Sequence, residues 1–429
     1  MNVAGAVAVF GEHAPDDVVI WRRGQGVTAA RIAAQTRAIA RVLPRSRYAI
    51  NLCESRHHFL IAFLAAAQCD QVSLLPSSRA PRAVREIQDA YPDHCLLTDD
   101  FVAAAARDEG LNEPLSIGAR DPIAIVFTSG STARPESHPK AWHTLCATAK
   151  LARERFLPQT RRFHVVATVP PQHMYGFETT VTMILLSGSA VSDGRPLFPA
   201  DIAAELASVP APRVLISTPA HLRACVAAQT RFPPLELIIS ATAALDRELA
   251  AAAERQWSTR IFEIYGCTEA GSMASRRTVE SDHWVAYPDS WVEPREAGAV
   301  YHGVHLPEPV ILQDILELDG PAKFRLVGRA ADMVKVAGKR ASLADLTRRL
   351  LDVRGVSDGV IFVPRPDARP AALVVAPGAS REDILAALAE QLDPVFVPRP
   401  LILVASLPRN ETGKIPRAAL LAAIGDSDE

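Results

Sequence analysis

The sequence carries almost no excess of charge, and it lacks several motifs that mark common protein classes. Its 46 basic and 48 acidic residues leave a formal net charge of −2, which argues against a broad electrostatic surface for nucleic acid. It has no CxxC pair, HExxH motif or Cys/His cluster, so we expect no zinc site of these types. The six cysteines are scattered along a chain too long to need a disulfide framework, and we expect reduced thiols.

Long apolar segments are missing as well. The most apolar stretch, Phe59–Ala67, is too short to span a bilayer. The N-terminal sequence has neither the basic start nor the long apolar run of a secretory signal. With 48% hydrophobic and 22% charged residues, the sequence predicts a cytoplasmic globular protein without an integral membrane segment.

Short runs rich in β-branched residues alternate with alanine-rich stretches of helical length. This alternation predicts an α/β fold, in which a large layered N-terminal domain contains a mainly parallel sheet. The expected strands are Ile123–Phe127, Val165–Val169, Val214–Ser217 and Leu237–Ser240, and the expected helices are His58–Gln68, Ala200–Ser208, Ala220–Ala228 and Asp246–Gln256.

A similar alternation of expected strands and helices occurs over a shorter stretch near the C-terminus. Ser342 and Ser380 are each followed three residues later by Asp, a pattern that resembles a capping box at the start of a helix. We therefore expect a small α+β domain over residues 331–429, after an N-terminal domain over residues 1–330. Its expected elements are the helices Leu343–Leu351 and Arg381–Leu392 and the strands Gly359–Val363 and Leu373–Ala376.

A turn rich in Gly, Ser and Thr follows the expected strand at Ile123–Phe127. Glycine lets the backbone approach a ligand, and main-chain N–H groups and hydroxyls can donate to phosphate oxygens. An ordinary surface turn is the alternative. The candidate phosphate loop consists of Thr128, Ser129, Gly130, Ser131 and Thr132.

Four segments, in order, carry a resemblance to a known family. They are IAIVFTSGSTARPESHPK at Ile123–Lys140, EIYGCTEAG at Glu263–Gly271, FRLVGRAADMVKVAGKR at Phe324–Arg340 and LPRNETGKIPR at Leu407–Arg417. Together they resemble the adenylate-forming superfamily of acyl-CoA synthetases, aryl-acid ligases and peptide-synthetase adenylation domains. The resemblance implies a large N-terminal domain, a mobile C-terminal domain, and ATP and Mg²⁺ as cofactors.

The resemblance also implies roles for individual residues. The TSGST loop would bind the triphosphate, Thr268 would face a phosphate, and Glu269 would be associated with the metal. Lys414 would contact the acid carboxylate and the α-phosphate during adenylation. Asp314 would hold the ribose, since a carboxylate can accept one hydrogen bond from each hydroxyl. The remaining nucleotide-binding residues would be Ala241, Thr242 and Tyr265 near adenine, Gly266, and Arg329 near the ribose or phosphate.

Two positions depart from the family pattern. After TSGST the family continues with Gly, any residue, Pro and Lys, whereas this chain has Ala133, Arg134, Pro135 and Glu136, and Arg134 or the later Lys140 could supply the missing charge. The hinge position, usually Asp or Lys, is Ala331 here, followed by Asp332. Beyond the hinge, the glycine-containing turn that approaches the pantetheine arm in relatives would include Lys335, Gly338 and Lys339.

The segment PPQHMYGFE, Pro170–Glu178, resembles the part of the family that borders the acyl substrate. His173, Tyr175, Gly176 and Phe177 would frame a flat aromatic acid, although a core position fits Tyr175 and Phe177 equally well. The chain is shorter than common full-length relatives, which favours a small acid.

The N-terminal segment INLCESRHHFLIAFLAAAQCDQVSLLPSSRAP further resembles the short ligases of aryl-polyene, xanthomonadin-type pigment pathways. This resemblance implies a ligase that activates a hydroxybenzoate-like acid as acyl-AMP and transfers it to the phosphopantetheine thiol of an acyl carrier protein. The alternatives are a small-acid CoA ligase and a catalytically quiet protein that binds a nucleotide or a carrier.

Overall fold

The computed structural model describes residues 6–108, 115–118, 121–128, 136–157, 162–295, 298–312, 314–329, 333–336, 339–365, 368–409 and 415–425. Contacts divide the chain into two compact units, of which the first comprises Met1–Asp289 and Gly303–Glu308 and the second Ser290–His302 and Pro309–Glu429. The expected domain boundary between residues 330 and 331 stays a prediction, because both residues lie outside the described residues.

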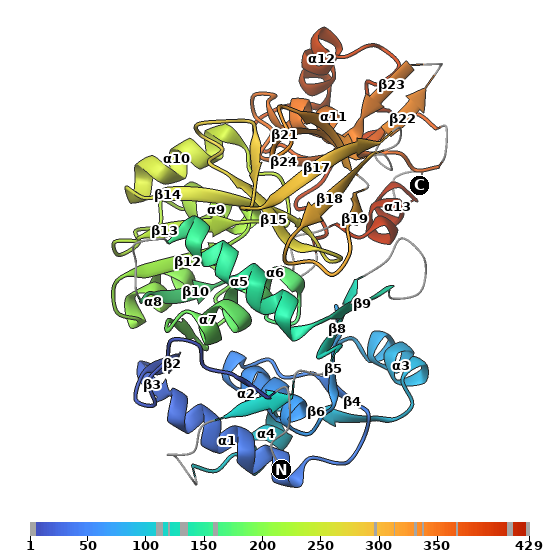
Figure 1. Cartoon of the computed structure of the whole chain (residues 1–429). Helices are drawn as coiled ribbons and strands as arrows, with labels where there is room; N and C mark the ends of the chain where they lie inside the picture. The colour runs from blue at the N-terminus through green and yellow to red at the C-terminus, as the bar shows by residue number, and fades with distance from the viewer. Residues whose placement is uncertain are drawn as a thin grey trace. The chain divides into compact units, whose positions relative to one another are not determined.

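The described residues of the first unit form two larger sheets and one two-stranded sheet (Figure 1). In the smaller sheet β6, β4, β5 and β8 are parallel, and β9 at its edge is antiparallel to β8. The strands in order are β6 (His94–Leu97), β4 (Tyr48–Asn51), β5 (Val72–Leu75), β8 (Ala124–Thr128) and β9 (Glu136–Lys140). A further pair, β1 (Ala6–Ala8) and β7 (Ser116–Gly118), is antiparallel.

The larger sheet of the first unit is parallel in its middle and antiparallel at both ends. Its strands in this unit are β16 (Trp284–Ala286), β15 (Gly271–Arg276), β14 (Arg260–Cys267), β13 (Leu237–Ser240), β12 (Arg213–Ser217), β10 (His164–Ala167), β11 (Ala190–Ser192), β2 (Val18–Arg22) and β3 (Gln25–Thr28). The helices are α1 (Ala29–Val42), α2 (Arg56–Gln68), α3 (Pro81–Ala90), α4 (Asp99–Ala105), α5 (Trp142–Phe156), α6 (Met174–Phe177), the π-helical turn η1 (Glu178–Thr182), α7 (Met183–Leu186), α8 (Pro199–Ser208), α9 (Pro219–Ala227) and α10 (Arg247–Trp257).

The apolar stretch Phe59–Ala67 forms most of α2. Ser55 caps this helix by accepting a hydrogen bond from the main-chain N–H of His58, and every residue from Arg56 to Ala67 is buried. A helical segment that is apolar on all sides is typical of a protein core. Burial in the core therefore accounts for this apolar stretch, and no membrane is needed to explain it. Within the residues that the structure describes, no helix combines the length and apolar character needed to cross a bilayer.

The described residues of the second unit form smaller sheets and three helices. Its strands are β17 (Ser290–Arg295), β18 (Gly298–Gly303), β19 (Val310–Leu312), β20 (Asp314–Leu318), β21 (Lys323–Arg329), β22 (Met333–Val336), β23 (Lys339–Ser342), β24 (Asp358–Phe362), β25 (Ala371–Val375) and β26 (Leu401–Leu403), and its helices are α11 (Leu343–Leu351), α12 (Arg381–Gln391) and α13 (Arg417–Gly425). The core of the predicted α+β domain forms where α11 and α12 pack on β24, β25 and β26 through Leu346, Leu350, Ile361, Val374 and Leu388.

The expected elements form, with ends that shift by one or two residues. Asp246, expected as the first helical residue, is the N-cap of α10 and accepts from the N–H of Leu249 at 2.8 Å. Ser380 and Asp383 form the expected capping box, and Ser342 accepts from the N–H of Asp345. All six cysteines are free.

Candidate active site

The hairpin of β8 and β9 places Thr128, the first residue of the predicted phosphate loop, opposite Glu136. Thr128 and Glu136 are register partners at the open end of this hairpin. Side chains two residues apart point to the same face of a strand, so Glu136, His138 and Lys140 share one face of β9. The loop residues Ser129, Gly130, Ser131 and Thr132, together with Arg134, lie outside the described residues.

Lys140 ties this strand to the turn that follows β14. Its ammonium group donates to the main-chain carbonyl oxygens of Thr268 and, at 2.8 Å, of Glu269. The side chain is buried, and burial lowers the pKa of its ammonium group, while the carboxylates of Glu178 and Glu269 oppose that shift. Lys140 therefore positions the predicted catalytic residues Thr268 and Glu269.

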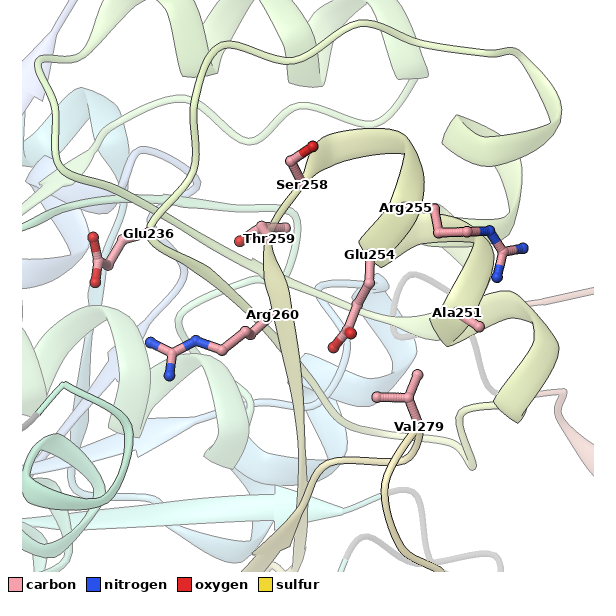
Figure 2. Close-up of a pocket in the computed structure, with 8 residues that line it drawn as sticks. All are labelled: Glu236, Ala251, Glu254, Arg255, Ser258, Thr259, Arg260 and Val279. Carbon is pink, nitrogen blue, oxygen red and sulfur yellow. The ribbon is translucent and has the colours of Figure 1, made fainter.

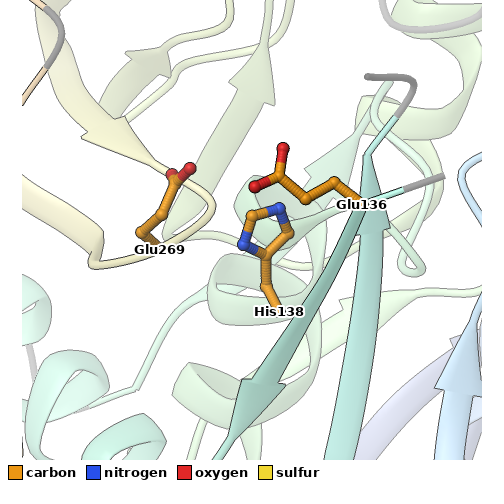
Figure 3. Close-up of side chains that lie close together, drawn as sticks. All are labelled: Glu136, His138 and Glu269. Carbon is orange, nitrogen blue, oxygen red and sulfur yellow. The ribbon is translucent and has the colours of Figure 1, made fainter. Parts of the chain in front are cut away.

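Three potential metal ligands converge beside this junction. Glu136, His138 and Glu269 each offer one ligand atom, and these atoms lie within 4.8 Å of one another. Figure 3 shows the imidazole of His138 beside the carboxylate of Glu136, with Glu269 to one side. The ring is buried, its Nε2 lies 3.2 Å from Oγ1 of Thr128, and burial lowers its pKa. A divalent cation fits this donor set of two carboxylates and one imidazole.

The other side of the turn is held by Glu178, a buried carboxyl in the π-helical turn. Ser272 donates to it from its main-chain N–H at 3.1 Å and from its hydroxyl at 2.5 Å. Burial raises the pKa of Glu178 to about 7, and the hydrogen bonds from Ser272 limit that rise. The preceding residue, Gly271, has φ of +77°, and a Cβ there would lie 2.2 Å from Oε1 of Glu178. A side chain here would be strained by the positive φ and would require the buried carboxyl of Glu178 to move.

The predicted acid-binding segment meets the carboxyl ends of parallel strands, where ligands commonly bind in open α/β sheets. The hydroxyl of Tyr175 donates to the carbonyl oxygen of Ile239 at 2.9 Å, and burial raises its pKa. His173 is the half-buried N-cap of α6. Gly176 is required because a Cβ would lie 2.0 Å from the carbonyl oxygen of Pro170. Phe177 is fully buried, which favours the core alternative for this residue.

Phe177 belongs to an aromatic cluster in the core. Its ring lies edge-on to those of Phe59 and Phe63, at centroid distances of 6.3 and 5.1 Å. The buried guanidinium of Arg56 lies nearby in sequence and donates to the carbonyl oxygens of Ala167 at 2.7 Å and Val169 at 2.6 Å. Arg56 thereby fixes the chain that leads into the acid-binding segment, a role that a single Arg in a helix does not reveal in sequence.

Hydroxyl side chains lie at the carboxyl ends of two adjacent strands of this sheet, β10 and β12. Oγ1 of Thr168 lies 3.1 Å from Oγ of Ser217 and 3.4 Å from Nδ1 of His221. Nδ1 of His221 also lies 2.9 Å from Oγ1 of Thr218, and burial lowers the pKa of this imidazole. Sequence reasoning missed this polar group, although a hydroxyl residue directly after each apolar strand was a usable signal.

Of the predicted adenine-binding residues, Ala241 and Thr242 directly follow β13, and Tyr265 lies on the neighbouring strand β14. Ala241 is buried, and Thr242 has φ of +80°, a strained conformation for a β-branched residue that is concentrated at functional sites. Tyr265 is buried with its ring 5.5 Å from that of Trp284. The ladder shifts at Gly266, where a Cβ would lie 2.3 Å from the carbonyl oxygen of Gly271.

The second unit contains the other predicted residues. Asp314, which is buried, and Arg329 are register partners of the antiparallel pair β20–β21, so the two predicted ribose ligands share one rung. Lys335 and Lys339 lie on the hairpin of β22 and β23, where Val336 pairs with Lys339. The remaining predicted residues, Lys414, Ala331, Asp332 and Gly338, lie outside the described residues.

A pocket of about 490 Å³ lies away from this site, between α10 and the start of β14 (Figure 2). Glu254 in its lining already accepts from the N–H of Ile261 at 2.8 Å and from Arg277 at 2.8 Å. None of the predicted site residues lines it. Glu254 therefore serves local structure, and we do not assign the pocket to catalysis.

Similarity to known proteins identifies the family of this chain. Residues 7–305 match the AMP-binding enzyme family, so the chain belongs to that family, the adenylate-forming ATP-dependent acid–thiol ligases. It is 28% identical over 342 residues to "4-coumarate--CoA ligase" of Halorhodospira halophila, a match that covers 74% of this chain and 81% of the relative. It is 22% identical over 419 residues to "Fatty acid--[acyl-carrier-protein] ligase MmaC" of Mycobacterium marinum, covering 82% and 77%.

Among solved structures, the fold is similar to that of the anthranilate CoA ligase AuaEII in complex with anthranoyl-AMP. The TM-score is 0.80 at 15% identity, and the superposition covers 98% of each chain. The predicted α/β fold of adenylate-forming type, with a large N-terminal and a smaller C-terminal domain, is confirmed.

Proposed function

We propose that this protein activates a small, hydroxybenzoate-like aromatic acid as acyl-AMP and transfers it to the phosphopantetheine thiol of an acyl carrier protein. The observation that carries the proposal is the junction of β9 with the turn after β14. There Lys140 holds the carbonyl groups of Thr268 and Glu269 beside the base of the TSGST loop. Family membership supplies the adenylate-forming chemistry.

In the first step, a carboxylate oxygen of the acid attacks the α-phosphorus of ATP, and the bond to pyrophosphate breaks. Thr128 and the loop after it would bind the triphosphate, and Lys414 would neutralise charge on the attacked phosphate. Mg²⁺, held by Glu269, would offset phosphate charge when bound. In the second step, the thiol sulfur attacks the acyl carbon, AMP leaves and the thiol proton passes to solvent.

The aromatic preference rests on the acid-binding segment and on the names of similar proteins. The hydrogen bond from Tyr175 to Ile239 holds its flat ring at the strand ends, and His173 is the N-cap of the short helix that contains Tyr175. The names 4-coumarate–CoA ligase and anthranilate CoA ligase refer to aromatic acids. The alternative is that the protein is a small-acid CoA ligase, since the names of both similar proteins specify CoA as the acceptor.

The test measures acid-dependent pyrophosphate release with hydroxybenzoates, cinnamates and fatty acids of increasing length. We expect the highest kcat/KM for an aromatic acid, because discrimination is expressed in that ratio. A long-chain fatty acid that outperforms every aromatic acid contradicts the proposed substrate class. Absence of release with every acid favours the catalytically quiet alternative, to which Glu136 and Ala331 point by departing from the family pattern.

The acceptor is tested separately by supplying CoA or a carrier protein to preformed acyl-AMP. Loading of an acidic carrier in preference to CoA supports carrier transfer. Efficient acylation of CoA, with every carrier left unloaded, supports the CoA ligase alternative.

A further inference from the structure

We propose that Glu136, His138 and Glu269 form a binding site for a divalent transition-metal ion such as Mn²⁺ or Zn²⁺, which binds without nucleotide. This inference goes beyond the proposed function, because occupancy would require neither ATP nor an acid. It also assigns a role to Glu136, the residue that replaces the family's lysine.

The geometry is close to that of a bound ion. The three ligand atoms lie within 4.8 Å of one another. Two ligands that bind one ion at about 2.1 Å can lie at most about 4.2 Å apart, so a modest rotation would complete the site. Glu136 is exposed and can make that rotation, whereas His138 is buried.

The surroundings hold the imidazole of His138 and the main chain of Glu269, whose side chain is exposed like that of Glu136. The hydroxyl of Thr128 contacts Nε2 of His138 at 3.2 Å, the kind of contact that orients a ligating imidazole. Lys140 holds the main chain of Glu269 through its carbonyl oxygen. The site therefore joins β9 to the turn after β14 at two adjacent places, one through Lys140 and one through the ion.

The charges favour a cation. Two carboxylates approach each other here, and neither makes an ion pair with a basic side chain among the residues that the structure describes. The ammonium group of Lys140 is near, but it bonds to main-chain oxygens rather than to either carboxylate. A divalent ion would relieve the remaining repulsion between Glu136 and Glu269.

The imidazole decides which ion is preferred. Mg²⁺ selects oxygen ligands and gives up water reluctantly, whereas nitrogen ligands raise the affinity for ions later in the first transition series. We therefore expect Mn²⁺ and Zn²⁺ to bind more tightly than Mg²⁺, and the preference to depend on His138.

The test titrates MnCl₂ alone into chelator-treated, full-length protein without nucleotide, and measures free Mn²⁺ by electron paramagnetic resonance. We expect one ion per chain, with affinity reduced about tenfold or more by Glu136→Gln and by His138→Asn. Competing Mg²⁺ should displace Mn²⁺ more readily from His138→Asn than from the wild type. Zn²⁺ binding, measured by calorimetry, should follow the same order.

Two matched controls remove the same groups elsewhere. Glu248→Gln removes an exposed carboxylate of α10, and His302→Asn removes a histidine of the second unit, so both should bind Mn²⁺ as the wild type does. Circular dichroism confirms that each variant is folded. If His138→Asn does not fold, the variant Glu136→Gln still tests the proposal, because Glu136 is exposed. Absence of Mn²⁺ binding without ATP, or equal affinity in Glu136→Gln and the wild type, overturns the proposal.

Discussion

Lys140 is the residue that joins the two halves of the candidate active site in the first unit. The sequence suggested it as a replacement for the phosphate-loop lysine, but its ammonium group bonds to the carbonyl groups of Thr268 and Glu269. A buried ammonium with two charge-assisted hydrogen bonds is costly to remove, because its acceptors lose their partner.

Lys140→Met keeps the length of the side chain and removes these hydrogen bonds. We expect the free energy of unfolding to fall by about 1–2 kcal/mol and acid-dependent pyrophosphate release to fall with it, since the turn loses its support. Lys150→Met, at an exposed position of α5, is the matched control and should change neither quantity. Wild-type stability together with wild-type release in Lys140→Met would show that the contact is dispensable.

Glu178 makes stability depend on pH. Its pKa of about 7 in the folded protein lies above its ordinary value of 4.5, so the folded state binds the additional proton between these values. The contribution of this group to the free energy of unfolding therefore falls as pH rises from about 4.5 to about 7. Glu178→Gln should abolish this part of the dependence, as measured by urea unfolding at several pH values in that range. If the free energy of unfolding changed with pH in the same way in the variant and in the wild type, this role of Glu178 would be contradicted.

The turn between β14 and β15 is the element that brings Glu269 to the site. It depends on Gly271, whose positive φ and contact with Glu178 leave no room for a side chain. At the β2–β3 turn, Gly24 has a similar φ of +75°, but a Cβ added there would meet nothing within 4 Å. A comparison of alanine substitutions at these two glycines therefore distinguishes two contributions to the loss of stability. One is the cost of the left-handed backbone, and the other is the cost of the steric clash with Glu178.

We expect Gly24→Ala to lower the free energy of unfolding by about 1–2 kcal/mol, the cost of a left-handed conformation. Gly271→Ala should lower it further and also weaken ATP binding, because Glu178 and the turn must move apart. Thermal unfolding and nucleotide titration measure the two effects. Equal losses of stability in both variants, with unchanged ATP binding, would mean that the contact with Glu178 has no consequence.

On the scale of the whole molecule, the proposed reaction requires residues of both units. Lys414 belongs to the second unit, and we expect Lys414→Ala to reduce acid-dependent pyrophosphate release by about a hundredfold or more. The fold should be unchanged by circular dichroism, because the sequence places this lysine on a Thr-Gly turn. Adenylate formation at the wild-type rate would refute the role of Lys414.

The second half-reaction should respond to a different residue of the same unit. Lys339 lies on the hairpin of β22 and β23, in a segment that also contains Lys335 and Arg340. If an acidic carrier protein approaches there, Lys339→Glu should slow transfer more than adenylation, and the defect should shrink as salt rises. A transfer defect that is independent of salt, or one equal to the adenylation defect, would argue against electrostatic docking.

The sequence predicted local features well. Helix α11 begins after its cap Ser342 and ends at Leu351 as expected, because its cap and its apolar spacing are encoded within a few residues. Asp314 and Arg329 are register partners, and their expected roles, at the ribose for Asp314 and at the ribose or phosphate for Arg329, stay predictions. The role of Phe177 was undecided in sequence, since an aromatic residue beside a substrate segment can face either a ligand or the core, and only packing against Phe59 and Phe63 distinguishes these positions.

By itself, the sequence determined the family, the α/β alternation and the segments that carry the proposed chemistry, because these depend on residues close together in the chain. The tertiary structure decided which distant groups meet. Lys140 and Glu269, 129 positions apart, become neighbours only when β9 lies against the turn after β14. Glu136, which looked like a lost lysine, and His138, which had no assigned role, become potential metal ligands for the same reason. Such encounters depend on strand pairing and turn geometry across the fold, and no local pattern of residues encodes them.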